Sequence, residues 1–418
     1  MKKVISSIIS PNFEKDDVSL SLKLVFSPWK WKRGPKIKEL ERVFKEKFGF
    51  SDCFSFNSGR SCLLAILEAM DIKEGDEVIV QGFTCNAVVN PIIKRGAKAI
   101  FVDLKDDLNI DERKIGEKIS SRTRAVIVQH TFGWPAEVKE VKDICQKNNL
   151  YLIEDCAHSL GAKYDGKYCG SFGDVSFFSF GKDKIISSVF GGMLVINNPK
   201  LLSRAMEAYN NSHFPSSFWI FEQLLYPFLM EYVFLPLFRF RPGRIFWSMM
   251  FELNVLSLRS VTKKENQGVL PLSFGKKLPN SLAALALNQL NKLERFNEHR
   301  REIARIYLKE LKDVAVFKED FGKRTPVFMR FPLLIDKAGL IVSEMRKFNV
   351  FLNDGWRETI VVPPKTIQEK MGYEKGECRL AEKVSKNIVS LPTHIKVSFE
   401  EAEEIASIVR SLVSKGGL

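Results

Sequence analysis

The stretch that decides the fold runs from residue 152 to residue 192 and holds three short motifs in a fixed order. It opens with Leu152-Ile153-Glu154-Asp155-Cys156-Ala157-His158, an apolar run that ends in acidic residues. Gly170-Ser171-Phe172-Gly173-Asp174 follows, and then Phe178-Ser179-Phe180-Gly181-Lys182-Asp183-Lys184, closed by Gly191-Gly192. The pattern predicts two buried strands. The first strand ends at a carboxylate, that of Asp155. The second is followed closely by a hydroxyl and an amine, those of Ser179 and Lys184.

Two of these residues have the chemistry that pyridoxal phosphate (PLP) requires. A lysine held in a dry pocket has a lowered pKa and can form a Schiff base with an aldehyde. A buried carboxylate can keep a pyridine nitrogen protonated, which lets PLP act as an electron sink. Lys184 is our candidate for the amine and Asp155 for the carboxylate. The alternative is that Lys184 is an ordinary solvated surface lysine, because the chain has 64 Lys and Arg residues.

The order of the motifs resembles the signature of the DegT/StrS-type sugar aminotransferases, which are PLP enzymes of the aspartate-aminotransferase fold (fold type I). The resemblance covers residues 30–200 and 275–415. It implies a PLP-dependent aminotransferase that converts a keto-sugar, carried by a nucleotide, into an amino-sugar with glutamate as the amino donor. Further segments that carry the resemblance are Asn57-Ser58-Gly59, Gly75-Asp76-Glu77-Val78-Ile79-Val80, Gly96-Ala97-Lys98-Ala99-Ile100-Phe101-Val102-Asp103 and Gln289-Leu290-Asn291-Lys292-Leu293.

The resemblance assigns a role to each residue of the central stretch. Lys184 binds the cofactor covalently and shuttles the proton, and its interval to the Gly-Gly pair favours it over its neighbour Lys182. Asp155 pairs with the pyridine nitrogen, and His158 contacts the phenolic oxygen of the cofactor. Ser179 binds the phosphate. The structural alternatives are a loop cap for Asp155, a satisfied buried ring for His158 and an ordinary strand hydroxyl for Ser179.

A second group of residues is expected around the phosphate. Residues 57–61 open a predicted helix that runs from Ser58 to Met70, and a helix N-terminus favours anions. Gly59 lets the backbone approach the ligand closely. Arg60 stands where the family usually has Thr, so a hydroxyl contact is lost and a charge is gained.

Three further positions depart from the family pattern. Cys85 stands where the family stacks an aromatic ring on the cofactor, so it packs there as a small soft group or Phe83 compensates. Lys277 lies near the position of an Arg that reaches the neighbouring subunit's phosphate. Phe190 replaces a Glu before the Gly-Gly pair. These changes leave cofactor use intact and place the identity of the substrate in doubt.

The remaining pattern predicts an α/β fold with a large domain, a mostly parallel sheet between helices, and a smaller C-terminal α/β domain. We expect an N-terminal arm over 1–35, a large PLP-binding domain over 36–278, a long connecting helix over 279–312 and the small domain over 313–418. Ligands of such sheets bind at the C-terminal ends of the strands. Asp155 and Lys184 both lie just beyond such ends.

Composition narrows the class of protein. The 418 residues are 45% hydrophobic and 27% charged, which is ordinary for a globular enzyme. The net charge is +14, but the charges are scattered and match no nucleic-acid-binding motif. The seven Cys residues form no CxxC pair, so we expect neither a metal site nor a disulfide framework. With no signal peptide recognised, these features favour a cytoplasmic protein.

Residues 213–258 do not fit the α/β pattern. They combine an aromatic-rich apolar run with Arg239, Arg241 and Arg244. Glu222 and the other acidic and proline residues argue against a simple membrane span. One interpretation is an interfacial element that makes peripheral contact with the cytoplasmic face of the membrane. The other is a helical pair buried in a dimer interface, where aromatics and Arg are also enriched.

Two further expectations concern assembly and substrate. The resemblance implies a homodimer with both active sites at the interface. In the sequence Asn353-Asp354-Gly355-Trp356-Arg357, an Arg beside a Trp can hold a carboxylate or diphosphate, and an exposed surface turn is the alternative.

Other functions stay open: a PLP-dependent sugar dehydratase, another PLP enzyme acting on a lipid-linked substrate, and a regulatory or scaffold protein on a PLP fold.

Overall fold

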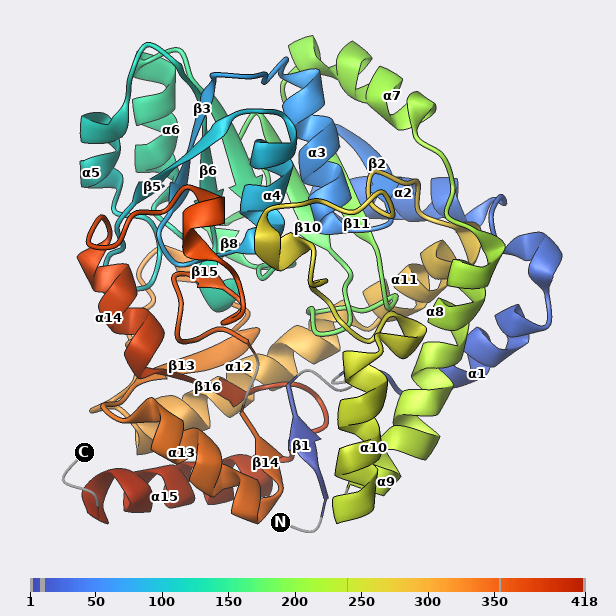
Figure 1. Cartoon of the computed structure of the whole chain (residues 1–418), viewed down its shortest axis with the longest axis vertical. Coiled ribbons are helices and arrows are strands. Elements are labelled where there is room, and N and C mark those ends of the chain that lie inside the picture. Colours follow the sequence, from blue (N-terminus) through green and yellow to red (C-terminus); the bar gives the residue numbers. More distant parts are fainter. Residues whose placement is uncertain (1–2, 8–11, 239, 353–354, 416–418) are drawn as a thin grey trace.

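A seven-stranded sheet forms the centre of the large domain (Figure 1). The computed structural model describes residues 3–7, 12–238, 240–352 and 355–415. Only β11 runs antiparallel to its two neighbours, so the predicted mostly parallel α/β fold is confirmed. In spatial order the strands are β2 (Asp52–Phe56), β11 (Gly192–Ile196), β10 (Val175–Ser179), β7 (Tyr151–Asp155), β6 (Thr123–Gln129), β3 (Glu77–Gln81) and β5 (Lys98–Val102).

Helices cover both faces of this sheet, because alternate side chains of each strand are apolar in both directions. On β3, for example, Val78 and Val80 pack on one face and Ile79 on the other. One face carries α3 (Gly59–Ala69), α4 (Asn86–Lys94) and α7 (Leu202–Asn211). The other carries α5 (Glu112–Ile115), α6 (Val138–Lys147), α2 (Lys36–Phe48) and α11 (Asn280–Leu290).

The segment predicted as one long connecting helix over 279–312 consists of two helices, α11 and α12 (Leu293–Glu310). Beside the break at Asn291-Lys292 lies α1 (Lys15–Val25), which belongs to the predicted N-terminal arm. The buried Asp17 of α1 accepts hydrogen bonds from Gln289 (2.7 Å) and Lys292 (2.8 Å) on either side of the break. Asp17 thus connects α1 to the end of α11 and to the break that follows it. The division of the chain into domains stays a prediction.

In the C-terminal part α12 packs against α15 (Phe399–Lys415). Next to them, α13 (Ala338–Met345) and α14 (Arg379–Asn387) pack on the antiparallel pair β13 (Arg330–Leu334) and β16 (Ile388–Pro392). Short strands tie it to other parts of the chain: β1 (Ile5–Ser6) to β14 (Val350–Phe351), and β15 (Val361–Val362) to β4 (Thr84–Cys85). A small three-stranded sheet joins β12 (Arg324–Thr325), β8 (Lys163–Tyr164) and β9 (Lys167–Tyr168). The β15–β4 pair places this part of the chain directly beside Cys85.

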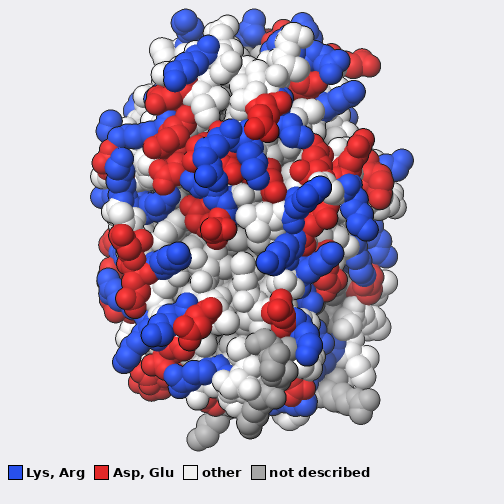
Figure 2. All heavy atoms as spheres, turned by 90° about the vertical axis from the view of Figure 1, so that its left-hand side faces the viewer, with Lys and Arg blue, Asp and Glu red and all other residues white. Residues whose placement is uncertain are grey.

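Residues 213–258 form a helical pair on the opposite flank from α5, α6 and α14 (Figure 1). One continuous helical segment contains α8 (Ser217–Leu229), a π-helical turn (Met230–Phe234) and α9 (Leu235–Phe238). The chain then turns back as α10 (Arg241–Glu252). The flank with α5 and α14 shows basic and acidic side chains intermixed, as on an ordinary solvated surface (Figure 2).

Candidate active site

The carboxylate of Asp155 lies at the C-terminal end of β7, as predicted, and is buried at 4% exposure. Its Oδ1 accepts a hydrogen bond from the Ala157 backbone N–H (2.9 Å). Burial raises the pKa of Asp155 to about 6, against the opposing effects of that N–H, of Lys184 and of His130. A buried carboxylate of this kind is most stable beside a cationic group.

Lys184 is on the loop between β10 and β11 and faces the same site. It follows β10, which is the parallel neighbour of β7, so it leaves the sheet at the same edge as Asp155. A Cβ on Gly181 would lie 3.5 Å from both the Lys184 Cγ and the Ser179 Oγ, which places the Lys184 side chain beside Ser179. The backbone of Lys184 is held by two contacts: its N–H donates to the Gly181 carbonyl (3.2 Å), and the amide of Asn12 donates to its carbonyl oxygen. The side chain is half-buried.

Lys182, the rival lysine, is the more deeply buried of the two at 3% exposure, but it faces the 213–258 segment. Its Nζ donates to the Ser257 carbonyl and lies 5.0 Å from the ring centroid of Phe190 and 4.6 Å from that of Tyr226. Burial lowers the pKa of Lys182 to about 7, with Asp183 and Glu222 opposing the shift. The surroundings of the two amines, rather than their burial, favour Lys184 as the reactive one.

His158 is buried in the same site, where its ring packs against those of Phe132 and Trp356. Its Nδ1 accepts from the Phe132 backbone N–H (3.4 Å), which leaves the proton of a neutral ring on Nε2. The ring is parallel to that of Phe132 (3°, 5.8 Å) and meets the edge of Trp356 at 4.8 Å. Burial, Lys184 and Arg330 lower the pKa of His158, so the ring is neutral and can donate from Nε2.

Trp356 is not on an exposed turn. It is 6% exposed and packs edge-on against Phe83 (5.4 Å) and Phe132 (5.2 Å), because the apolar rings at the ends of the sheet strands require a cover. The neighbouring Arg357 lies beside Glu358, with Nε 3.1 Å from a carboxylate oxygen. Asn353 and Asp354 lie outside the described residues. A role for Arg357 in binding substrate stays a prediction.

The N-terminus of α3 and the end of β10 form one cradle. Ser58 caps α3 by accepting from the Ser61 N–H (3.2 Å). Gly192 allows the close approach of α3 to the sheet, because a Cβ there would lie 2.6 Å from the Ser58 carbonyl carbon. A Cβ on Gly59 would meet Ser179 at 3.2 Å, so these two residues are neighbours. Backbone N–H groups and a hydroxyl thus converge where an anion fits.

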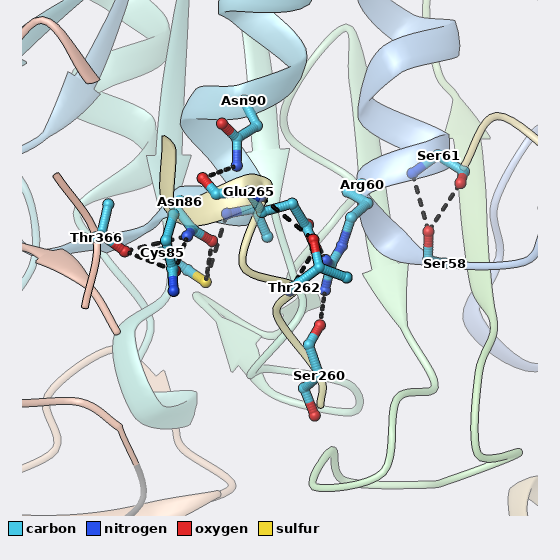
Figure 3. A network of polar contacts seen from close by, with 12 residues as sticks. Ser58, Arg60, Ser61, Cys85, Asn86, Asn90, Ser260, Thr262, Glu265 and Thr366 are labelled. Carbon is cyan, nitrogen blue, oxygen red and sulfur yellow. Dashed lines mark hydrogen bonds and ion pairs between the residues drawn. The ribbon is translucent and has the colours of Figure 1, made fainter. Parts of the chain in front are cut away.

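Arg60 is bound to the chain segment that follows the helical pair (Figure 3). Its guanidinium forms an ion pair with the fully buried Glu265 and donates to the Ser260 carbonyl (2.8 Å). Thr262 donates to Glu265 through its backbone N–H (2.8 Å) and its hydroxyl (2.9 Å). The charge of Arg60 is therefore balanced within the chain. Contact between Arg60 and a phosphate stays a prediction.

Cys85 caps α4, since its Sγ accepts from the Ala87 N–H (3.5 Å). Burial raises the pKa of this thiol, while Arg60 and Lys184 oppose the shift. The next residue, Asn86, donates to Asn266 (3.1 Å) and Thr366 (3.1 Å), so three distant segments meet here (Figure 3). A contact between Cys85 and the cofactor stays a prediction.

Lys277 and Phe190, which also depart from the family pattern, have partners within the chain. The amine of Lys277 donates to the Asn210 carbonyl (3.2 Å) and lies 4.9 Å from the ring centroid of Tyr209. Phe190 packs against Trp219 of α8 (5.3 Å) and against Lys182. The helical pair of residues 213–258 therefore contacts the loop that carries Lys184.

Glu154 is a structural residue that the sequence pattern did not single out. Its buried carboxylate accepts from three backbone N–H groups, those of Gly170 (2.8 Å), Phe172 (2.7 Å) and Gly173 (2.7 Å). His130 lies 3.1 Å from the same carboxylate. Together with Cys156 these side chains could surround a metal ion, but the carboxylate is already occupied by its N–H donors. Glu154 instead explains the Gly-Ser-x-Gly-Asp motif, whose turn it holds beneath Asp155.

The residues present fit PLP. Asp155 supplies the buried carboxylate for a protonated pyridine nitrogen, Lys184 the amine, and Ser179 with the α3 N-terminus the phosphate cradle. The family model described as the DegT/DnrJ/EryC1/StrS aminotransferase family matches residues 14–219 and 245–410. The chain belongs to this family. It is a PLP-dependent aminotransferase of the fold type I class.

Similar proteins agree with this assignment. The chain is 27% identical over 414 residues to the dTDP-3-amino-3,6-dideoxy-alpha-D-galactopyranose transaminase of Aneurinibacillus thermoaerophilus, covering 96% of both chains. PseC from Helicobacter pylori, an aminotransferase involved in the biosynthesis of pseudoaminic acid, superimposes with a TM-score of 0.75 at 21% identity, covering 99% of this chain and 100% of PseC. The PLP form of the sugar aminotransferase Spr1654 from Streptococcus pneumoniae gives a TM-score of 0.73 at 19% identity, covering 99% of both.

The family match leaves out residues 220–244, which lie within α8, the π-helical turn, α9 and the start of α10. The family model thus does not describe this segment. The prediction that 213–258 does not belong to the common pattern agrees with this gap.

Proposed function

We propose that this aminotransferase moves an amino group from an amino acid, with glutamate as donor, to a keto-sugar carried by a nucleotide. The main support is that Asp155 and His158 follow β7 and Lys184 follows β10, since these two strands are parallel neighbours and end at the same edge of the sheet. The named activity of the Aneurinibacillus relative, a dTDP-sugar transaminase, supports the substrate class.

The side chains have distinct tasks in this reaction. PLP, when bound, supplies an aldehyde and a ring that accepts electrons. The Lys184 amine binds it and then carries a proton between the substrate carbon and the cofactor. Asp155, buried at the strand end, keeps a proton on the pyridine nitrogen. The neutral His158 donates from Nε2, and the aromatic cover of Trp356 and Phe132 excludes water from this side of the site.

A half-reaction screen tests the proposal. Glutamate added to the purified PLP-loaded protein should release 2-oxoglutarate and leave pyridoxamine phosphate, and nucleotide-linked keto-sugars should reverse the change. Lys184→Ala is the negative control, and Lys182→Met should remain active. Bound PLP that glutamate does not convert to pyridoxamine phosphate would favour the dehydratase alternative. A protein that binds no PLP would favour the regulatory or scaffold alternative.

The proposal includes the assembly and location of the enzyme. It acts as a homodimer in the cytoplasm, with peripheral contact between residues 213–258 and the cytoplasmic face of the membrane. Support comes from the fold shared with sugar aminotransferases and from the helix Ser217–Phe238. That helix is long and apolar enough to cross a membrane, with a mean hydropathy of 1.2. Sedimentation of the active enzyme tests the dimer, and an active monomer would contradict it.

A further inference from the structure

The outward face of the helical pair is apolar, which is the reverse of an ordinary surface helix. On α8 and its continuation, Phe218 is 71% exposed and Tyr232 is 53% exposed. The half-buried Phe221, Leu225 and Phe228 lie between them at intervals of three and four residues, so all five share one face. A stripe of this length would be costly in water.

The second helix of the pair repeats the pattern. Ile245 (64%) and Met249 (51%) on α10, and Leu253 (68%) directly after it, are exposed at intervals of four residues. At the turn between the helices Leu237 and Phe240 are exposed as well. The two stripes and the turn form the apolar face, defined by Phe218, Phe221, Leu225, Phe228, Tyr232, Leu237, Phe240, Ile245, Phe246, Met249 and Leu253.

The inward face of the same helices is fixed to the rest of the fold. Ile220, Leu224, Met230 and Phe234 are buried against it. The Leu224 carbonyl accepts from Ser21 of α1, and Glu231 forms an ion pair with Lys396. Only 39% of the most apolar window is buried, so the helix is anchored along one side and uncovered along the other. A helix held in this way lies along a bilayer surface rather than crossing it.

We propose that the apolar face docks the enzyme on a lipid bilayer, in the plane of the lipid headgroups. This deepens the peripheral location proposed above and does not depend on which sugar is aminated. A second copy of the chain is the competing occupant. Two observations favour lipid: the family model does not match residues 220–244, and the helix Ser217–Phe238 is long and apolar enough to enter a bilayer.

The sequence led us to expect a cluster of basic side chains on the helical pair that would contact lipid, and the structure differs at Arg244. Arg244 turns inward, where it donates to the Phe238 carbonyl (3.0 Å) and to Asn349 (3.2 Å) and lies over the ring of Phe351. Arg239 and the side chain of Arg241 lie outside the described residues. The apolar face therefore dominates the contact, while the net charge of +14 favours an anionic bilayer.

The chain segment that follows the helical pair contacts residues in and beside the candidate active site. The segment that leaves α10 supplies Ser257 to Lys182 and Glu265 to Arg60. Insertion of the apolar face into lipid thus places the loop of Lys184 close to the bilayer surface. A substrate attached to a membrane lipid would reach the site without leaving the surface.

Flotation of the PLP-loaded enzyme with vesicles tests the inference. The vesicles are phosphatidylcholine with and without phosphatidylglycerol. Binding is expected, stronger with the anionic lipid. The double variant Phe240→Ser/Ile245→Ser should lower partitioning about a hundredfold, because two large apolar side chains no longer enter the lipid. The matched control Met206→Ser/Leu340→Ser removes two exposed apolar side chains elsewhere and should bind as the parent does.

Two readouts separate the possible outcomes. Turnover of a soluble nucleotide-linked keto-sugar should be the same for the parent and the double variant, so a failed activity assay with intact flotation counts only against the proposed reaction. No flotation of the parent at low salt would overturn the docking inference. So would equal loss of binding in the control variant, or dissociation of a dimer in Phe240→Ser/Ile245→Ser during sedimentation, which would assign the apolar face to a second copy.

Discussion

Replacing Lys182 with methionine should make the protein more stable at neutral pH. The amine is 3% exposed, lies between two aromatic rings and has a pKa of about 7 instead of 10.5. Below pH 7 the charged amine is buried in the folded state and hydrated in the unfolded one. The shift corresponds to a cost of about 5 kcal/mol, and the side chain of Met has a similar length without the charge.

The pH dependence gives the sharper test. Between about pH 7 and pH 10.5 the folded state holds fewer protons at Lys182 than the unfolded state, so stability rises with pH across this window. The parent should gain about 1.4 kcal/mol per pH unit relative to Lys182→Met, or about 3 kcal/mol from pH 7 to pH 9. The free energy of unfolding is measured in urea at each pH, with Lys147→Met, an exposed site, as the control. Equal slopes for the parent and Lys182→Met would refute the reasoning.

The other predictions concern the groups around the proposed PLP site. Asp155→Asn should stabilise the cofactor-free protein above pH 6 by about 3 kcal/mol, because the parent loses stability as pH rises from 3.8 to about 6, and urea unfolding checks this. Arg60→Met should cost about 3 kcal/mol by leaving the buried Glu265 unpaired, and Arg60→Met/Glu265→Gln should recover most of it in the same assay. Gly192→Ala should weaken PLP binding on the order of tenfold by displacing α3, whereas Gly116→Ala, which has open space, should not; absorbance titration measures both.

Local periodicity predicted much of the fold. The helix predicted from Ser58 to Met70 is present as α3 at Gly59–Ala69. Short apolar strands alternating with helices required a parallel sheet, and such a sheet brings strand ends to one edge. Asp155 and Lys184 therefore lie at the same edge of the sheet. These features depend on spacing within one element, which a sequence displays directly.

Contacts between distant segments could not be predicted in this way. Arg60 and Glu265 are 205 positions apart, and no periodicity connects them. The aromatic surroundings of Lys182 exist only because α8 folds back on the loop after β10. An exposed turn was one of two interpretations of the segment with Trp356, but the cover that Trp356 gives to Phe83 and Phe132 is a tertiary contact. Each of these depends on packing between elements rather than on the pattern within one.

The most direct test of the central claim is to locate the lysine that binds the cofactor. The PLP-loaded protein is reduced with borohydride and digested, and the peptide that carries the pyridoxyl group is sequenced by mass spectrometry. The label should be on Lys184 in the parent and in Lys182→Met, and should be absent from Lys184→Ala. A label on Lys182, or a reducible adduct that survives in Lys184→Ala, would contradict the assignment of Lys184 as the catalytic amine.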